Sequence, residues 1–262
     1  MNYPSLLDTA KKAALAAGEE IMAIYNSADF GIEQKADDSP LTKADKNAHL
    51  AIVEILEATK LPVLSEEGRA IPFEERQHWT TFWMIDPLDG TKEFIKRNGE
   101  FTVNIALIEE GNPILGVVYA PVLDTLYYGG TSVGCSKMKV DNSELDLPKR
   151  AIESIDELKL KNVRIVASRS HQNQATEDYI NSFASHELVS MGSSLKFMVL
   201  AEGNADVYPR FAPTMEWDTA AADAVLRSLG YSVFKVSENT EISQSSIDYN
   251  KENLLNPYFI AY

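Results

Sequence analysis

The sequence predicts two halves of different architecture, an α+β half over residues 1–155 followed by an α/β half over residues 156–262. Two observations carry this prediction. Up to about residue 128, apolar residues recur first at helical and then at strand spacing, which is typical of helices packed on an antiparallel sheet. From about residue 160, short apolar runs alternate with helical segments, which is typical of α/β architecture.

Two amphipathic helices open the first half. Apolar residues recur at steps of three and four from Leu6 to Tyr25, with Ser5 placed to cap the helix, and again from Thr42 to Ala58. Short apolar runs then predict strands over residues 62–64, 82–85, 101–108, 114–119 and 125–128. Turn and polar residues predict loops over residues 29–40 and 129–148, the second with room for one hairpin.

The second half alternates between the two periods. Apolar runs predict strands over residues 163–166, 187–190, 205–208 and 232–236. Helical spacing predicts helices over residues 172–183, 193–202 and 219–229. The boundary between the halves is expected in the segment that precedes the first of these strands.

The composition excludes several classes of protein. At 45% hydrophobic and 24% charged residues, the chain is neither disordered nor collagen-like, and the single cysteine, Cys135, permits no intramolecular disulfide. The net charge of −15 argues against nonspecific nucleic-acid binding, although a bound divalent cation would still admit a small phosphorylated substrate. Because no signal peptide and no transmembrane run is evident, we expect a soluble, cytoplasmic protein.

The segment from Asp86 to Glu93 (DPLDGTKE) contains the strongest chemical signal. Two carboxylates, Asp86 and Asp89, follow an apolar strand, and a proline and a glycine bend the chain around them. Such a bend lets the carboxylates and the Leu88 carbonyl converge on one hard divalent cation. The same residues are also common in ordinary turns, so this segment alone leaves both interpretations open.

Further acidic residues lie in separate parts of the chain. Glu66 and Glu67 end a predicted strand, and Asp218 opens an alanine-rich helix. Each also has a simpler interpretation, because Asp218 fits a helix N-cap and the two glutamates fit a solvated loop. Asp45 similarly fits a capping box with Thr42 at the start of the second helix.

The sequence segments that contain these residues resemble those of a known family. Segments 64–67 (LSEE), 83–94 (WMIDPLDGTKEF) and 217–221 (WDTAA) resemble the three signature blocks of the inositol monophosphatase superfamily, which are lithium-sensitive, Mg²⁺-dependent phosphomonoesterases. Segments 91–104 (TKEFIKRNGEFTVN), 168–171 (SRSH) and 192–197 (GSSLKF) resemble its CysQ-type 3′(2′),5′-bisphosphate nucleotidase branch. The resemblance implies a layered αβαβα sandwich with the active site between the two halves.

The resemblance also implies a role for each matching residue. The ligands of two or three Mg²⁺ ions would be Glu66, Asp86, the Leu88 carbonyl, Asp89 and Asp218. Thr91 and Asp45 would orient and polarise the attacking water, with Glu67 as a further catalytic residue just outside the metal ligands. The substrate would be bound by Gly90, Thr91, His171, Ser193, Lys196 and Arg210. Helix caps for His171 and Ser193, and a polar loop for Arg210, are the simpler alternatives.

These roles predict hydrolysis of the 3′-phosphate of adenosine 3′,5′-bisphosphate to AMP and phosphate. The 3′-phosphoadenylyl sulfate of sulfur assimilation is a second possible substrate. An inositol or other sugar monophosphatase is the alternative enzyme, against which Lys92 and Glu93 favour the nucleotidase branch. An acidic metal- or nucleotide-binding protein without activity is the non-enzyme alternative. The family also admits peripheral binding at the cytoplasmic side of the inner membrane, and the oligomeric state is left open.

Overall fold

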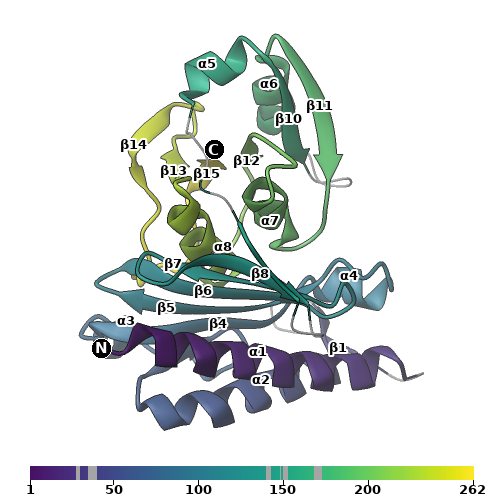
Figure 1. Ribbon diagram of the computed structural model, residues 1–262, viewed down its shortest axis with the longest axis vertical. Helices are drawn as coiled ribbons and strands as arrows, with labels where there is room; N and C mark the ends of the chain where they lie inside the picture. Colours follow the sequence, from purple (N-terminus) through teal and green to yellow (C-terminus); the bar gives the residue numbers. More distant parts are fainter. Residues whose placement is uncertain (28–29, 35–39, 140–142, 148, 150–152, 168–172) are drawn as a thin grey trace.

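The computed structural model describes residues 1–27, 30–34, 40–139, 143–147, 149, 153–167 and 173–262. Figure 1 shows α1 and α2 at the bottom, the large sheet above them, α7 and α8 above the sheet, and the shorter strands with α5 and α6 in the upper part. This order confirms the expected αβαβα sandwich. None of the helices in the described ranges is long and apolar enough to cross a membrane.

The first layer consists of α1 (Tyr3–Tyr25) and α2 (Lys43–Leu56), and both bury an alanine-rich face against the sheet. Asn2, not Ser5, caps α1, because the Asn2 side chain accepts a hydrogen bond from the Ser5 backbone N–H at 3.3 Å. Thr42 caps α2 as expected. The helix ends two residues before Ala58 and continues as a single 3₁₀ turn, Glu57–Thr59.

A seven-stranded sheet forms the second layer, in the order β3-β4-β5-β6-β7-β8-β9. The strands are β3 (Val63–Ser65), β4 (Thr81–Asp89), β5 (Thr102–Glu109), β6 (Asn112–Ala120), β7 (Thr125–Gly130), β8 (Gly134–Lys139) and β9 (Glu144–Asp146). Only β3 is parallel to its neighbour, and every other pair in this sheet is antiparallel. The predicted loop over residues 129–148 therefore holds two strands that extend the sheet.

The third layer is α7 (Leu195–Ala201) and α8 (Glu216–Leu229), and α8 packs closely on the sheet. A Cβ atom at Gly116 on β6 would lie only 2.0 Å from the Ala221 carbonyl oxygen, so the glycine permits this close approach. The small side chains of α8 serve the same purpose, since Ala220 to Ala222 are all buried. This packing holds the first turn of α8 next to the end of β4.

The upper layers hold the remaining strands and helices. The strands are β10 (Asn162–Ala167), β11 (Ser185–Ser190), β12 (Tyr208–Arg210), β13 (Val233–Val236), β14 (Ile242–Ser246) and β15 (Tyr258–Ala261). The helices are α5 (Ile155–Lys159) and α6 (Gln174–Asn181). Short elements elsewhere are β1 (Glu33–Gln34), β2 (Pro40–Leu41), α3 (Phe73–Arg76) and α4 (Thr91–Ile95).

Among the described strands of the second half, β10 and β11 are the one pair of strands that is parallel, and a single parallel bridge joins Ile165 to Val207. In contrast, β12, β15, β13 and β14 form an antiparallel sheet in that order. The strand expected at 205–208 begins only at Tyr208 and is antiparallel to the C-terminal strand β15. The proposed boundary at residues 155 and 156 falls in the first turn of α5 and stays a prediction.

Candidate active site

A bulge in β4 places two acidic side chains on the same face of the sheet. Asp86 pairs with Asn104 on β5, and Asp89 pairs with Thr102, so β4 advances three residues where β5 advances two. Cross-strand partners share a face, and residues two apart on one strand do so as well. The extra residue therefore brings Asp86 and Asp89 together on the face that α8 covers, which also holds Ala106 of β5.

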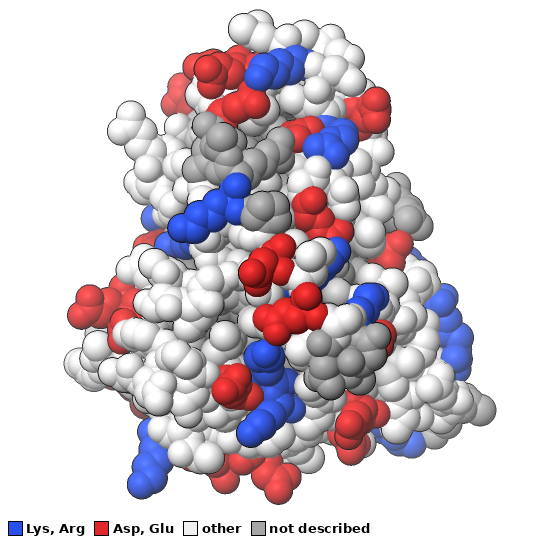
Figure 2. All heavy atoms as spheres, viewed as in Figure 1, with Lys and Arg blue, Asp and Glu red and all other residues white. Residues whose placement is uncertain are grey.

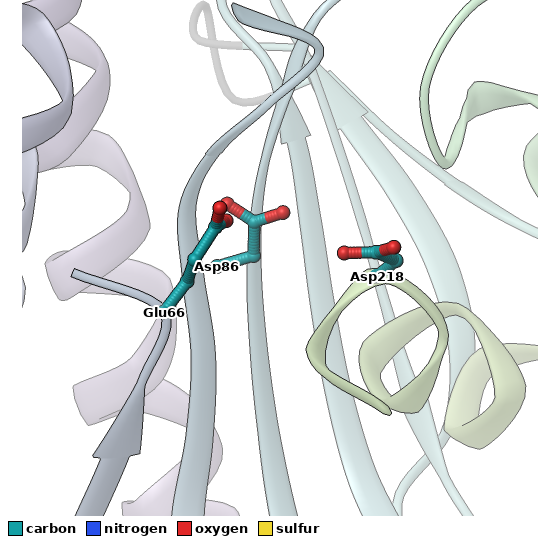
Figure 3. Close-up of side chains that lie close together, drawn as sticks. All are labelled: Glu66, Asp86 and Asp218. Carbon is teal, nitrogen blue, oxygen red and sulfur yellow. The ribbon is translucent and has the colours of Figure 1, made fainter. Parts of the chain in front are cut away.

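Glu66 and Asp218 reach the same point from two other elements. Glu66 follows β3, and its backbone N–H donates to the Ile85 carbonyl at 3.2 Å. Carboxylate oxygens of Glu66, Asp86 and Asp218 all lie within 4.8 Å of one another. Figure 3 shows the three side chains converging from the β3 end, from β4 and from the start of α8.

Asp218 is not the N-cap residue of α8, which was the simpler interpretation of this residue. Met215 is the N-cap residue of α8, and Asp218 lies in the first turn, where its Oδ2 accepts from the Met215 backbone N–H at 2.8 Å. Its carboxylate thus satisfies one backbone donor at the helix start. The hydrogen bond orients the side chain toward Asp86.

The charges of the cluster repel one another. Burial raises the pKa of Asp86 well above its usual range, and the neighbouring charges of Glu66, Asp89 and Asp218 raise it further. Burial likewise raises the pKa of Asp218, with Asp89 as the next contributor. A divalent cation removes this repulsion, and donors that are all oxygen fit a hard ion. The residues present therefore fit a metal site.

Asp89 and Leu88, which were also predicted as metal ligands, lie next to the cluster of Glu66, Asp86 and Asp218 but are not part of it. The charge of Asp89 acts on both Asp86 and Asp218, while its Oδ2 accepts hydrogen bonds from Ser193 and Ser194. The Leu88 side chain is buried in the core that α1 and α2 form with the sheet. Its carbonyl oxygen accepts from the Thr91 hydroxyl at 3.3 Å.

Thr91 and Asp45 contact each other directly. The Thr91 Oγ1 donates to Asp45 Oδ1 at 3.0 Å, and Asp45 is almost completely buried. The other carboxylate oxygen of Asp45 accepts from the Thr42 backbone N–H at 2.7 Å and from the Thr42 hydroxyl at 2.6 Å. The capping box is therefore present, and it aims the remaining oxygen at Thr91, so the two interpretations of Asp45 are compatible.

Glu67 lies in the turn after Glu66, outside the three-carboxylate cluster. Its backbone N–H donates to the Ser65 hydroxyl oxygen at 3.3 Å, and that oxygen also lies 2.9 Å from Nδ1 of His49 on α2. Ser65 thus links this turn to the first helix layer. The catalytic role of Glu67 stays a prediction.

A pocket of about 380 Å³ opens beside the acidic cluster. Both acidic and basic side chains line it, together with small and aromatic residues. Among them are Asp89, Gly90, Lys92, Ser193, Lys196, Phe197, Tyr208, Arg210 and Asp218. Four of the six predicted substrate-binding residues therefore lie at one cavity, and Thr91 follows Gly90 directly. His171 lies outside the described residues.

Two cations in the pocket wall have few partners within the protein. Lys196 is only 9% exposed, and its Nζ donates to the Ser193 carbonyl at 3.0 Å. The Arg210 Nη2 donates to the Pro213 carbonyl at 3.2 Å, and its buried Nε has no hydrogen-bond partner in the described ranges. Burial lowers the pKa of Lys196, and the positive charge of Arg210 lowers it further against the opposing charge of Asp89. An anion in this pocket would stabilise both cations.

Gly90 joins β4, which carries Asp86 and Asp89, to the pocket. It precedes α4 with a φ of +93°, in the left-handed region that favours glycine. A Cβ atom here would also lie 3.3 Å from the Ser193 Cβ. The glycine therefore permits both the turn after Asp89 and the close approach of the loop before α7.

The residues that donate hydrogen bonds to Asp89, or hold those donors in place, were not predicted as a group from the sequence. Thr102 and Asn104 on β5, and Ser194 before α7, are buried polar residues beside it. A signal exists for the two strand residues, because Thr102 and Asn104 are polar at alternate positions of an otherwise apolar strand.

Comparison with known proteins is consistent with this geometry. Residues 2–260 match the inositol monophosphatase family. A 3′(2′),5′-bisphosphate nucleotidase CysQ of Salmonella typhimurium is 44% identical over 261 residues, which cover 97% of this chain and 98% of the relative.

Two solved structures support the fold. The crystal structure of CysQ from Bacteroides thetaiotaomicron, a bacterial member of this family, superposes with a TM-score of 0.85 at 44% identity, covering 99% of this chain and 97% of that one. An inositol monophosphatase from Anabaena superposes with a TM-score of 0.69 at 23% identity, covering 100% and 91% of the two chains. The second likeness concerns the fold alone.

Proposed function

This chain belongs to the inositol monophosphatase family, and on that premise we propose that it is a metal-dependent 3′(2′),5′-bisphosphate nucleotidase. Its substrate is adenosine 3′,5′-bisphosphate, from which it removes the 3′-phosphate to give AMP. The observation that carries the proposal is one pocket with two kinds of lining residue. The carboxylates Asp89 and Asp218 suit metal ions, and the cations Lys196 and Arg210 suit a phosphate. A substrate with two separate phosphate groups needs both kinds of partner.

The metal is Mg²⁺, held by Glu66, Asp86, Asp89, Asp218 and the Leu88 carbonyl, with two or three ions in a complete site. Hard oxygen donors of this kind are the ligands that Mg²⁺ uses beside substrate phosphates. Bound ions at such a site stabilise the attacking and leaving oxygens and lower the pKa of a bound water. The repulsion between Asp86 and its neighbours supports this assignment, because a cation relieves it.

Thr91 orients the attacking water. Its single hydroxyl hydrogen has Asp45 Oδ1 at 3.0 Å as its nearer acceptor and the Leu88 carbonyl at 3.3 Å as its more distant one, so the lone pairs of Oγ1 remain to accept a hydrogen from water. A water held in this way directs its own lone pair toward the phosphorus atom and can pass a proton by way of Thr91 to Asp45. Thr42 holds Asp45 Oδ2 by two hydrogen bonds, so Asp45 Oδ1 stays directed at Thr91.

Lys196 and Arg210 bind the phosphate that is not hydrolysed or the nucleoside that carries it. Lys196 and the Nε atom of Arg210 are buried, and guanidinium and ammonium groups bind phosphate through charge-assisted hydrogen bonds. Gly90 lines the same pocket and precedes α4, and the backbone N–H groups of Gly90 and Thr91 bind the phosphate that reacts.

The surface charge suits a small substrate. On the face shown in Figure 2, the described Lys and Arg side chains are separated by acidic and uncharged ones and do not form one basic area. With a net charge of −15, long-range attraction of a polyanion is unfavourable. A cytoplasmic location, with or without peripheral contact to the inner membrane, stays a prediction from the sequence.

The test is phosphate release from four substrates with Mg²⁺ and with EDTA. They are adenosine 3′,5′-bisphosphate, 3′-phosphoadenylyl sulfate, inositol 1-phosphate and fructose 1,6-bisphosphate. We expect the highest kcat/KM for one of the two adenosine compounds and no turnover in EDTA. A preference for inositol 1-phosphate would make the chain a sugar monophosphatase. No turnover of any substrate with Mg²⁺ would leave the non-catalytic alternative.

A further inference from the structure

One oxygen of Asp89 is occupied by hydrogen bonds from the opposite half of the chain. Asp89 Oδ2 accepts from the Ser193 hydroxyl at 2.6 Å and from the Ser194 backbone N–H at 2.6 Å. The Asn104 side-chain amide approaches the same oxygen at 3.4 Å. A carboxylate oxygen has two lone pairs, so these donors fill Oδ2 and leave Oδ1 to bind a cation.

A count of hydroxyl hydrogens gives these bonds a direction. Ser193 donates its only hydroxyl hydrogen to Asp89, and Ser194 donates its own to the Asn104 carbonyl oxygen at 2.8 Å. Thr102 Oγ1 lies 2.6 Å from the Ser193 Oγ and 2.7 Å from the Ser194 Oγ. Because both serine hydrogens are committed, Thr102 donates to one serine oxygen. The donors thus form a chain that ends at Asp89.

The backbone of Ser193 adopts a conformation that favours glycine. Its φ is +52°, in the left-handed region that non-glycine residues seldom adopt. Glycine would occupy this position without strain, so the serine is retained at a conformational cost. The hydroxyl on Asp89 is what serine supplies and glycine lacks. The family resemblance implies that Ser193 contacts the substrate, and its hydroxyl hydrogen also bonds to Asp89 within the protein.

We propose that Ser193, supported by Thr102, is a positioning residue for the metal ligand Asp89, in addition to any contact that it makes with the substrate. The inference rests on the proposed metal-dependent function. The Ser193 carbonyl oxygen also accepts a hydrogen bond from Lys196 Nζ at 3.0 Å. One residue therefore connects the pocket cation with the metal ligand, so removal of its hydroxyl weakens metal binding before any substrate is present.

The test measures Mg²⁺ binding to the substrate-free full chain, from the thermal midpoint as a function of Mg²⁺ concentration. The variants are Ser193→Gly and Ser193→Ala, which differ in backbone strain but both lose the hydroxyl. We expect the Mg²⁺ Kd to rise about ten- to hundredfold in both, as is typical when a partner of a metal ligand is removed. Ser193→Gly should unfold at the same temperature as the parent or a higher one when metal is absent.

Two further comparisons separate positioning from general destabilisation. Thr102→Val should raise the Mg²⁺ Kd in the same direction, whereas Thr102→Ser keeps the donor and should restore it. The matched control is Ser185→Ala, which removes an exposed hydroxyl that donates to Asn162 at 2.8 Å, and should leave Mg²⁺ binding unchanged. An unchanged Mg²⁺ Kd in both Ser193 variants, with a raised substrate KM, would overturn the inference and leave Ser193 as a substrate contact only. No Mg²⁺ binding by the parent chain would instead refute the proposed function.

Discussion

Replacement of Lys196 by methionine tests how the pocket selects its substrate. Methionine keeps most of the apolar length of the buried side chain and removes only the ammonium group, which donates to the Ser193 carbonyl at 3.0 Å. Because Lys196 is 9% exposed, its contact with a phosphate is shielded from water. A charge-assisted hydrogen bond of this kind contributes about 1.5–3 kcal/mol, which corresponds to about ten- to hundredfold in kcat/KM.

The assay compares two nucleotides on the same variant. We expect Lys196→Met to lower kcat/KM by about ten- to hundredfold for adenosine 3′,5′-bisphosphate but by about twofold or less for adenosine 3′-monophosphate, which lacks the second phosphate. Thermal unfolding of the variant controls for misfolding. Equal losses on both substrates would refute the reasoning, because Lys196 would then belong to the common phosphate site or to the scaffold.

The same residue predicts a pH dependence. Burial lowers the pKa of Lys196, so it loses its charge at a lower pH than a solvated lysine does. The kcat/KM for adenosine 3′,5′-bisphosphate should therefore fall as the pH rises through this lowered pKa. In Lys196→Met this alkaline limb should disappear, and a limb that persists in the variant would assign it to another group.

Three other perturbations follow from the structure. Asp89→Asn keeps the shape but removes one negative charge from the metal site, so activity should fall at least about a hundredfold with an unchanged unfolding temperature; normal turnover would make Asp89 a simple turn residue. Activity should vanish on chelation and return with Mg²⁺, while Ca²⁺ and Li⁺ inhibit, and full activity in EDTA would end the metal assignment. Gly116→Ala should destabilise the fold by about 1–3 kcal/mol or more, measured by denaturant unfolding, because its Cβ would lie 2.0 Å from the Ala221 carbonyl oxygen; an unchanged midpoint would show that α8 can move away.

The elements that the sequence predicts well are those specified by local patterns. The two first-layer helices and the strands β3 to β7 follow from their spacing, and the capping box of Thr42 and Asp45 is a contact between residues three apart. The C-terminal strand β15 was not predicted, because its place between β12 and β13 depends on long-range pairing. The strands β8 and β9 are the one hairpin that the sequence admits in the polar stretch 129–148, and their pairing with β7 is what the local pattern does not show.

In the candidate site, too, the residues that are adjacent in the sequence could be predicted, and the long-range contacts between them could not. The Asp86-to-Glu93 segment indicates metal ligands because its carboxylates, proline and glycine are adjacent in the sequence. The bulge that turns Asp86 and Asp89 to one face depends on the register with β5, which spacing on one strand does not reveal. The hydroxyl that holds Asp89 comes from Ser193, 104 residues away, so only the folded chain brings them together.

Identification of the product formed from adenosine 3′,5′-bisphosphate tests the central claim most directly. The purified chain is incubated with this compound and Mg²⁺, the nucleotide product is separated by chromatography, and the released phosphate is measured. The proposed site predicts AMP carrying only its 5′-phosphate, one equivalent of phosphate, and no reaction in EDTA. Adenosine 3′-monophosphate as the product, or equal rates with and without EDTA, would contradict it.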